Sequence, residues 1–336
     1  MVPYALECVE SGEELSMERM AETMGQIMEG QWEEEEIARL LVALHEKGET
    51  VAEIAGAAAA MREHMTPIRA NRPDVIDVVG TGGDGSGTFN ISTAAALVTA
   101  AAGAPVAKHG NRRFTSRSGS ADVLVELGVN IEADVATVED CLETLGICFC
   151  FAPLLHKAMK HVAPVRKKLK IPTIFNILGP LANPARTSLQ LLGVGRDALR
   201  PVMAEALRLL GIRRAVVVFG SDGLDEVTLG GATHVTEVAG ALVREFDWTP
   251  ADFDLEPVDR EALLVEGPQQ SAAVIRGILD DRPGPPRDIV VANAAAALWT
   301  AGLVATPAEG AQAAGEAISS GAARELLARL AERTGG

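Results

Sequence analysis

The first seventy residues carry apolar side chains at the spacing of α-helices. Methionine and isoleucine recur every three or four positions over residues 17–28, and this stripe ends at Gly30. Isoleucine and leucine form a second stripe over residues 37–44. Thr50-Val-Ala-Glu53 then has the form of a capping box, which begins a helix by satisfying exposed backbone amides. We predict a small helical domain over residues 1–70, with small and apolar helix faces suited to an interface.

The spacing changes after residue 74, where short runs of β-branched and other apolar residues alternate with helical stretches. The expected strands are 75–79, 105–107, 147–151 and 215–219, and the expected helices between them are 92–102, 121–127 and 197–210. Residues 234–238 and 241–246 should pair as a hairpin. This alternation predicts an α/β domain over residues 71–336, larger than the first, with a mostly parallel sheet covered by helices.

Length and charge restrict the partners that such a chain can have. At 336 residues it exceeds what one compact core usually supports, which agrees with two domains. Its 30 basic and 46 acidic residues give a formal charge of −16, and only 4% of the residues are aromatic, so nucleic acid is not an expected partner. A phosphate site would have to be a local positive region within an acidic surface.

Neither targeting nor membrane insertion is expected. The N-terminus has no basic stretch before an apolar run, and the weakly polar stretch at 91–107 is too short and too interrupted to span a bilayer. Cys8, Cys141, Cys148 and Cys150 form no Cys-x-x-Cys pair. We therefore expect reduced thiols and a cytoplasmic location.

A glycine-rich segment, Gly80-Thr-Gly-Gly-Asp-Gly-Ser-Gly87, lies between an expected strand and an expected helix. Glycines let backbone amides approach a phosphate closely, and the helix N-terminus adds its positive dipole end. The segment also satisfies the Gly-x-Gly-x-x-Gly pattern of dinucleotide folds but lacks the Gly-Lys-Ser/Thr ending of nucleotide-binding loops. A phosphate loop is favoured, and a glycine-rich turn without a ligand is the alternative.

The end of the next strand distinguishes between phosphate ligands. A dinucleotide site requires an acidic residue there, to bind ribose hydroxyls. This chain has the basic segment Lys108-His-Gly-Asn-Arg112, followed by Arg113 and the donor-rich stretch 115–120. The pattern favours a second phosphate or a pyrophosphate.

Asp225 and Glu226 follow the strand at 215–219 as neighbouring carboxylates. Carboxylates combined with water and substrate phosphates are typical Mg²⁺ ligands, and the hydroxyl of Ser92 could join them. The alternative is a solvated acidic turn. Arg166 could hold a carboxylate of a second substrate with its planar guanidinium, or it could belong to a basic helix face. His156 is more typical of a core or surface histidine than of a catalyst.

These segments together resemble the anthranilate phosphoribosyltransferase family. The resemblance rests on motifs in a specific order and extends to about residue 300. The motifs are Gly80-Thr-Gly-Gly-Asp84, Asn90-Ile-Ser-Thr93, Lys108-His-Gly-Asn-Arg112, Ser118-Gly-Ser-Ala-Asp122, Ala158-Met-Lys-His-Val-Ala-Pro-Val-Arg166, Thr173-Ile-Phe-Asn-Ile-Leu-Gly-Pro-Leu-Ala-Asn-Pro184 and Leu224-Asp-Glu226. The resemblance implies transfer of the phosphoribosyl group of phosphoribosyl pyrophosphate to the amine of anthranilate, with release of pyrophosphate, in tryptophan biosynthesis. It also implies a homodimer, and a helical domain that part of residues 160–185 joins in space.

The resemblance implies a role for each matched site residue. Lys108 and Arg166 would be catalytic. Phosphoribosyl pyrophosphate would contact Gly80, Gly83, Asp84, Thr88, Asn90, Ile91, Ser92, Thr93, Lys108, His109, Gly110, Asn111, Arg112, Arg113, Phe114, Thr115, Ser116 and Ser120. Anthranilate would contact Gly80, Asn111 and Arg166, and two Mg²⁺ ions per subunit would bind Ser92, Asp225 and Glu226.

The chain departs from the usual family pattern at a few positions. Arg113, Phe114 and Arg117 lie in the second loop, and Lys157 and Lys170-Ile-Pro172 lie near the expected acceptor site, so a modified anthranilate is an alternative acceptor. A pyrimidine nucleoside phosphorylase has a similar Lys-His-Gly-Asn loop, but its glycine loop usually reads Ser-Thr-Gly-Gly-Val. A nicotinamide dehydrogenase is opposed by Lys108 at the second strand end, and a nucleic-acid-binding relative by the net charge.

Overall fold

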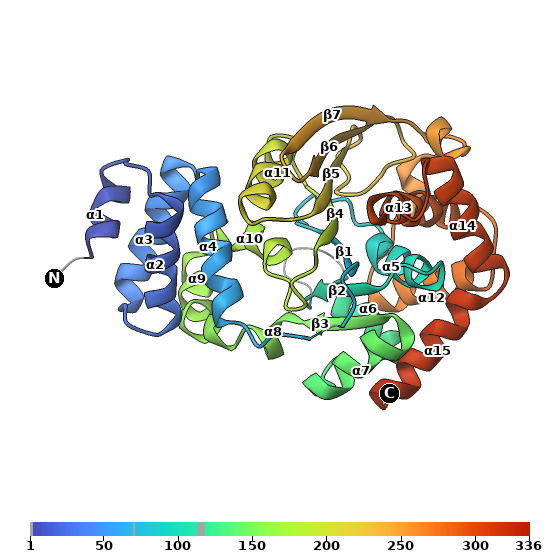
Figure 1. The fold of residues 1–336 in the computed structure, drawn as a ribbon, viewed down its shortest axis with the longest axis horizontal. Coiled ribbons are helices and arrows are strands. Elements are labelled where there is room, and N and C mark those ends of the chain that lie inside the picture. The colour runs from blue at the N-terminus through green and yellow to red at the C-terminus, as the bar shows by residue number, and fades with distance from the viewer. Residues whose placement is uncertain (1–2, 70, 113–117) are drawn as a thin grey trace.

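The structure, a computed structural model, describes residues 3–69, 71–112 and 118–336 (Figure 1). In this part of the chain four helices precede the first strand: α1 (Tyr4–Glu10), α2 (Met17–Met28), α3 (Glu34–Lys47) and α4 (Val51–His64). The three helices expected from the apolar stripes and the capping box are therefore confirmed. Helix α1 is an addition to the prediction, because its 7 residues are too few for a helical stripe to stand out.

The capping box at the start of α4 does more than begin a helix. Thr50 Oγ1 accepts a hydrogen bond from Glu53 N, and Thr50 N donates to Glu53 Oε2 over 2.8 Å. The fully buried Glu53 carboxylate also accepts from Lys47 Nζ at 2.9 Å and from Leu15 N at 3.1 Å. One carboxylate therefore joins the end of α3, the start of α4 and the segment before α2.

Seven strands form one sheet in the order β3-β2-β1-β4-β5-β6-β7. They are β1 (Ile76–Gly80), β2 (Val106–Gly110), β3 (Ile147–Phe151), β4 (Leu189–Gly193), β5 (Arg214–Gly220), β6 (Thr233–Ala239) and β7 (Leu242–Trp248). Strands β1 to β5 are parallel, and β6 and β7 are antiparallel to their neighbours, so the mostly parallel sheet and the final hairpin are confirmed. Strand β4 is missing from the prediction, because Leu-Gln-Leu-Leu-Gly contains no β-branched residue.

The other α-helices are α5 (Ile91–Ala101), α6 (Ser120–Glu126), α7 (Val135–Leu145), α8 (Ala152–Leu155), α9 (Ala163–Leu169), α10 (Phe175–Leu178), α11 (Leu199–Leu209), α12 (Pro268–Leu279), α13 (Pro285–Ala301), α14 (Pro307–Ser319) and α15 (Ala322–Thr334). Short 3-10 helices are η1 (Lys157–His161), η2 (Gly179–Leu181), η3 (Pro250–Phe253) and η4 (Arg260–Leu263). In the described ranges no helix combines the length and the apolar character needed to cross a membrane.

The sheet separates two hydrophobic cores. Alternate residues of β5 point to opposite faces, so that Val216 and Val218 pack among α5, α13 and α14, while Ala215 and Val217 pack on the other side. The second core also contains α2 to α4, α11 and the apolar residues of the 162–182 segment. In Figure 1 the N-terminal helices lie at one end of the molecule, the sheet in the middle, and α12 to α15 at the other end.

Helices α2 and α4 pack closely at Gly56, which generates a testable prediction. A Cβ atom at Gly56 would lie 2.9 Å from Met20 Cβ and closer still to the carbonyl oxygen of Met17. Replacing a helical glycine by alanine normally favours the helix by up to ~1 kcal/mol, but here the clash should dominate. We expect Gly56→Ala to lower the free energy of unfolding by about 1–3 kcal/mol, measured by urea denaturation.

Gly25→Ala is the matched control, because a Cβ at Gly25 in α2 meets only His64 Cε1, at an ordinary 3.6 Å. This variant should be as stable as the original protein or slightly more stable. Equal stability of the two variants would contradict the close packing at Gly56.

Candidate active site

The polar segments found in the sequence follow strands whose carboxyl ends lie at one edge of the sheet. Strands β1 and β4 are neighbours, although the chain proceeds from β1 outward to β2 and β3 before it returns to β4. The strand order therefore reverses between β1 and β4. Crevices at such reversal points are where open α/β sheets bind ligands.

The glycine loop after β1 is held against this reversal point. Thr81 N donates to the Gly193 carbonyl at 2.9 Å, and Gly195 N donates to Thr81 Oγ1 at 3.1 Å. Gly82 N donates to Asp225 Oδ2 at 2.8 Å. Both β4 and the loop after β5 therefore fix the glycine loop.

The loop needs glycine for its backbone conformation. Gly82, Gly83 and Gly85 have φ values of +66°, +82° and +66°, in the region that favours glycine. A Cβ atom at any of the three would meet nothing within 4 Å, so open space lies over this part of the loop. Without side chains at these positions, an anionic ligand can approach the backbone of the loop closely.

The loop after β5 approaches the ends of β1 and β4 so closely that both strands must end in glycine. A Cβ at Gly80 would collide with the Asp225 carboxylate, and a Cβ at Gly193 would collide with the Asp225 backbone. The loop after β5 thus crosses directly over the ends of β1 and β4. This crossing brings Asp225, and with it the neighbouring Glu226, to the glycine loop.

Asp225 and Glu226 are buried close together, which is unfavourable for the charged forms of their carboxyl groups. Burial, with the nearby charge of Asp84, raises the pKa of Asp225 to about 7. Burial and the charge of Asp225 raise the pKa of Glu226 well above its usual value. Glu226 Oε1 accepts from Ser92 N at 3.0 Å, so the carboxylate occupies the amino end of α5.

Lys108 lies beneath these carboxylates with only 4% of its surface exposed. Its ammonium group donates to the Val78 carbonyl at 2.7 Å and to Ser92 Oγ at 3.2 Å. Burial lowers the pKa of Lys108, while the negative charges of Asp77, Glu226 and Asp225 oppose that shift. The side chain is therefore a buried counter-charge for the acidic groups.

The carboxyl groups suit a divalent cation only together with other ligands. No three His, Cys, Asp or Glu side chains converge as a complete metal site within residues 3–69, 71–112 and 118–336. The carboxyl groups of Asp225 and Glu226 lie close together beside Ser92, and their crowded negative charges would favour a cation. Mg²⁺ commonly binds to one or two carboxylates and completes its shell with water and phosphate.

The loop after β2 is only partly available for a ligand. His109 is buried, and a Cβ at Gly110 would collide with Ser120 Oγ. Asn111 is exposed, and its Oδ1 accepts from Arg112 N at 2.7 Å. Arg112 forms ion pairs with Asp122 and Glu132 at 3.4 and 3.5 Å, so its guanidinium is already engaged. The expected donor contacts Arg113, Phe114, Thr115 and Ser116 lie outside the described residues.

At the start of α5 some side chains are buried in the core, and others are held in hydrogen bonds at the surface of the site. The side chains of Ile91 and Thr93 are each only 1% exposed, so a ligand could reach these residues only through their backbone. Asn90 Oδ1 accepts hydrogen bonds from Ser118 Oγ at 2.7 Å and from Ser271 Oγ at 2.8 Å. Sequence reasoning missed Ser271, which comes from α12 and has no local signal. Thr88 Oγ1 lies 3.2 Å from Ser86 Oγ, at the end of the glycine loop.

Arg166, the expected acceptor residue, comes from α9. Its Nη2 donates to Asn176 Oδ1 at 3.3 Å, and its guanidinium carbon lies 5.6 Å from the centre of the Phe175 ring. Burial lowers the pKa of Arg166. In the sequence Asn176 and Phe175 are only part of a motif, whereas in the structure they are the immediate surroundings of Arg166.

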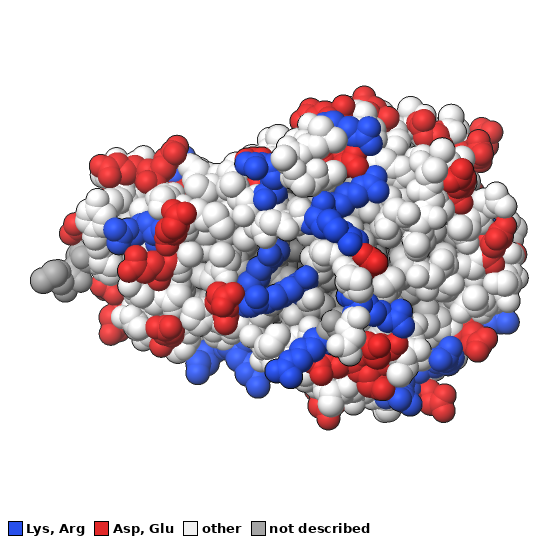
Figure 2. Space-filling view, viewed as in Figure 1, with Lys and Arg blue, Asp and Glu red and all other residues white. Residues whose placement is uncertain are grey.

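Basic side chains gather across the middle of the face shown in Figure 2, while acidic side chains lie mostly around its margin. The protein has a formal charge of −16, so this distribution is not what an even spread of charge would give. A positive region inside an acidic exterior is the arrangement expected for a phosphate site.

Comparison with known proteins identifies the family to which the chain is similar. Residues 3–65 match the helical bundle domain of the glycosyl transferase family, and residues 72–324 match its a/b domain. The anthranilate phosphoribosyltransferase of Rhodopirellula baltica is 50% identical over 321 residues, which cover 96% of this chain and 94% of the relative.

Solved structures agree over the same length. The crystal structure of anthranilate phosphoribosyltransferase from Thermus thermophilus has 43% identity and a TM-score of 0.93, with 99% of each chain covered. The enzyme from Saccharomyces cerevisiae, in complex with PRPP and Mg, has 29% identity and a TM-score of 0.89, with 99% of this chain and 97% of that chain covered. Identity at this level along nearly the whole chain shows that it belongs to the anthranilate phosphoribosyltransferase family.

Proposed function

We propose that this chain transfers the phosphoribosyl group of phosphoribosyl pyrophosphate to the amine of anthranilate and releases pyrophosphate, as a step of tryptophan biosynthesis. The observation that carries the proposal is the glycine loop at the β1–β4 reversal point. Open space lies over three glycines of the loop, while Asp225 accepts a hydrogen bond from Gly82 N and the ammonium group of Lys108 lies buried among the acidic groups. The named relatives support the same reaction.

The donor would lie over the glycine loop, with its pyrophosphate toward the ends of β1 and β2. An ammonium group has three donors, and Lys108 uses two of them on Val78 and Ser92. Displacement at the anomeric carbon places negative charge on the leaving pyrophosphate, which a nearby fixed cation stabilises. We therefore assign Lys108 an electrostatic role and Gly80, Gly83, Asp84 and Thr88 a role in binding the donor.

Two Mg²⁺ ions would bind at Ser92, Asp225 and Glu226, and when bound they would neutralise charge on the pyrophosphate. Lys108 donates to Ser92 Oγ, which directs the hydroxyl lone pairs and so prepares the oxygen as a ligand. Ser92 N holds Glu226 in place. The yeast relative in complex with PRPP and Mg supports the use of magnesium.

The acceptor would meet Arg166, Asn111 and the backbone of Gly80. Anthranilate carries a carboxylate beside its amine, and a guanidinium group can hold that carboxylate with two parallel hydrogen bonds. The aromatic amine is a neutral nucleophile, so a strong base is not required. Asn176 and Phe175 already contact the guanidinium group, so Arg166 would lose less conformational entropy when it binds the acceptor.

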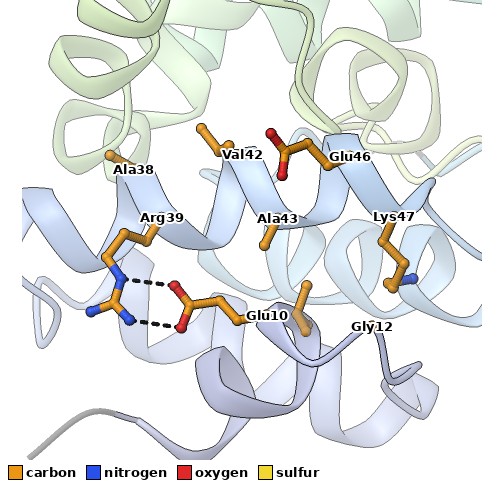
Figure 3. Close-up of a pocket in the computed structure, with 9 residues that line it drawn as sticks. Glu10, Gly12, Ala38, Arg39, Val42, Ala43, Glu46 and Lys47 are labelled. Carbon is orange, nitrogen blue, oxygen red and sulfur yellow. Dashed lines mark hydrogen bonds and ion pairs between the residues drawn. The ribbon is translucent and has the colours of Figure 1, made fainter.

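We also propose that two copies associate through a groove between α1 and α3 (Figure 3). The groove has a volume of about 510 Å³. Val9, Ala38, Val42 and Ala43 supply its apolar lining, and Glu10 is paired with Arg39 at its margin, with Nη2 to Oε2 at 2.7 Å. Small apolar side chains bordered by charges of both signs suit contact with an identical surface.

A cytoplasmic location is proposed as well. All four cysteines are free and buried, which is usual where thiols stay reduced.

Arg166 provides the first test. We expect Arg166→Ala to lower kcat/KM for anthranilate by the equivalent of about 2–4 kcal/mol, because a charged contact to the acceptor is lost. Binding of phosphoribosyl pyrophosphate should change little in calorimetry. Lys168→Ala is the matched control, since Lys168 lies on the same helix and pairs with Glu34 at the surface. Equal losses in both variants would remove Arg166 from the acceptor site.

The assay itself tests the reaction. Anthranilate should be consumed with phosphoribosyl pyrophosphate and Mg²⁺, and one pyrophosphate should appear for each anthranilate. If instead pyrophosphate never appears and thymidine or uridine is cleaved in phosphate buffer, the chain is a nucleoside phosphorylase.

The raised pKa of Asp225 generates a prediction about stability in metal-free buffer. The folded pKa is about 7 and the ordinary value is 3.8, so between these values the folded protein holds a proton that the unfolded chain has released. The free energy of unfolding therefore falls as the pH rises from the ordinary pKa of 3.8 to the folded pKa of about 7. We expect Asp225→Asn to raise Tm at pH 8 but not at pH 4, by about 2–4 °C for each kcal/mol of relieved repulsion.

Asp225→Asn also tests metal binding separately from folding. Asparagine keeps an oxygen that can accept from Gly82 N, but Mg²⁺ should no longer raise Tm, and turnover should be lost. Asp254→Asn, at an exposed position, should change neither quantity. Full turnover of Asp225→Asn would contradict the metal assignment.

The proposed dimer is tested by sedimentation. The protein should sediment at twice 35.2 kDa at micromolar concentration. Val42→Glu should produce monomers, because it would bury a charge in the groove. Val125→Glu, which changes an exposed valine on α6, should leave the dimer intact. A monomeric original protein would contradict the proposal.

A further inference from the structure

A carboxyl group interrupts the apolar strand β1. Asp77 lies in the run Val75-Ile-Asp-Val-Val79, is fully buried, and has no part in the proposed reaction. Parallel strands are usually apolar throughout, because helices cover both faces of the sheet, and a polar group buried there needs partners. Burial raises the pKa of Asp77 to about 6, while the Asn183 side chain and the charge of Lys108 oppose that shift. An apolar residue at this position would avoid the cost of burying the carboxyl group.

The pairing of β1 with β2 is interrupted beside Asp77. Strand β1 pairs with β4, and β2 with β3, along their whole length, whereas β1 and β2 share the single residue pair Ile76 and Val106. In a regular parallel ladder the next bonds would join the His109 amide to the Val78 carbonyl and the Val78 amide to the Ala107 carbonyl. Buried backbone groups that lose these bonds must find other partners.

Two charged side chains bond to backbone groups of the missing pair. Asp77 Oδ1 accepts from His109 N at 3.2 Å. Lys108 Nζ donates to the Val78 carbonyl at 2.7 Å. The amide and the carbonyl that would bond to each other in a regular ladder are therefore each bonded to a side chain of the neighbouring strand.

Asn183 bonds to a further backbone group of the missing pair. Its Nδ2 donates to the Ala107 carbonyl at 2.8 Å, while its Oδ1 accepts from Ala185 N, also at 2.8 Å. Side chains from β1, from β2 and from the segment after η2 thus supply bonds that the backbone supplies elsewhere in the sheet.

The bond between Asp77 and the His109 amide affects where the ammonium group of Lys108 lies. If the ladder continued, the His109 amide would donate to the Val78 carbonyl and compete with the ammonium group for it. Because Asp77 holds that amide, the carbonyl is left to Lys108 Nζ, which also donates to Ser92 Oγ at 3.2 Å. The interrupted ladder therefore fixes a cation between the end of β1 and the start of α5.

We propose that Asp77 is a positioning residue: by accepting from the His109 amide it keeps β1 and β2 from pairing at this point, and so fixes the ammonium group of Lys108 on the Val78 carbonyl, next to Ser92. The proposal rests on the proposed function for its kinetic effect but not for the pairing of the strands. Asp77 touches neither substrate nor metal in this account. Its loss should affect the step that needs the cation more than the binding of the acceptor.

Crystal structures of single variants test the strand pairing without any substrate. Asp77→Val has no acceptor, and valine favours strands, so we expect the His109 amide to bond to the Val78 carbonyl and the ammonium group of Lys108 to leave it. Asp77→Asn keeps an oxygen that can accept from His109 N, and its strands should stay as they are in the original protein. An Asp77→Val structure in which Lys108 still donates to the Val78 carbonyl and the ladder remains interrupted overturns the proposal.

Kinetics test the positioning. We expect Asp77→Val to lower kcat about a hundredfold, because the leaving pyrophosphate loses a fixed cation, while KM for anthranilate stays within about threefold. Asp77→Asn should recover most of the lost kcat. Val216→Ala is the matched control, since it also changes a fully buried strand residue, in β5, and should lower Tm while kcat stays within about twofold.

The outcomes separate the two proposals. An original protein that does not consume anthranilate contradicts the proposed function, whereas the crystal structures still test the strand pairing. If anthranilate is consumed but Asp77→Val keeps its kcat, or Asp77→Asn loses as much kcat as Asp77→Val, Asp77 has no positioning role through the His109 amide. If Asp77→Val does not fold, Asp77→Ala, which also lacks an acceptor, takes its place in both tests.

Discussion

A buried ammonium group makes this site possible. The ammonium group of Lys108 lies near the end of β1, where Asp77, Asp225 and Glu226 bring negative charge into a poorly hydrated place. Each of these carboxyl groups would be costly to bury alone. The fixed cation offsets part of that cost and also holds Ser92, while glycines at Gly80 and Gly193 let the acidic loop come close enough to reach it.

Much of the fold could be predicted because its signals are local. Apolar stripes mark α2 and α3, β-branched runs mark β1 and β5, and the ends of parallel strands must share one edge of a sheet. Strand β4 gave no such signal, since leucine and glutamine are as common in helices. Yet β4 is central, because its pairing with β1 creates the reversal at which the glycine loop lies.

The site could be predicted less fully, because many of its side chains bond to residues that are far away in the sequence. The sequence identifies Asn90 and Arg112 as polar groups on the right loops. It carries no signal that Ser271, 181 positions away, binds Asn90, or that Asp122 and Glu132 engage Arg112. Side-chain direction was equally hidden for Thr93, whose neighbours in a motif suggest a ligand but whose helix turns it into the core.

Helices α2 to α4 share their core with residues 162–182, and this affects folding while the chain is being synthesised. Residues of α2 to α4 pack with Val165, Phe175 and Leu178, which the ribosome adds roughly 100 residues after α4 is complete. At synthesis rates of ~5–20 residues per second, helices α2 to α4 wait on the order of 5–20 s with an apolar face uncovered. A chaperone that binds nascent chains would find its target in that interval, before the second half of the core arrives.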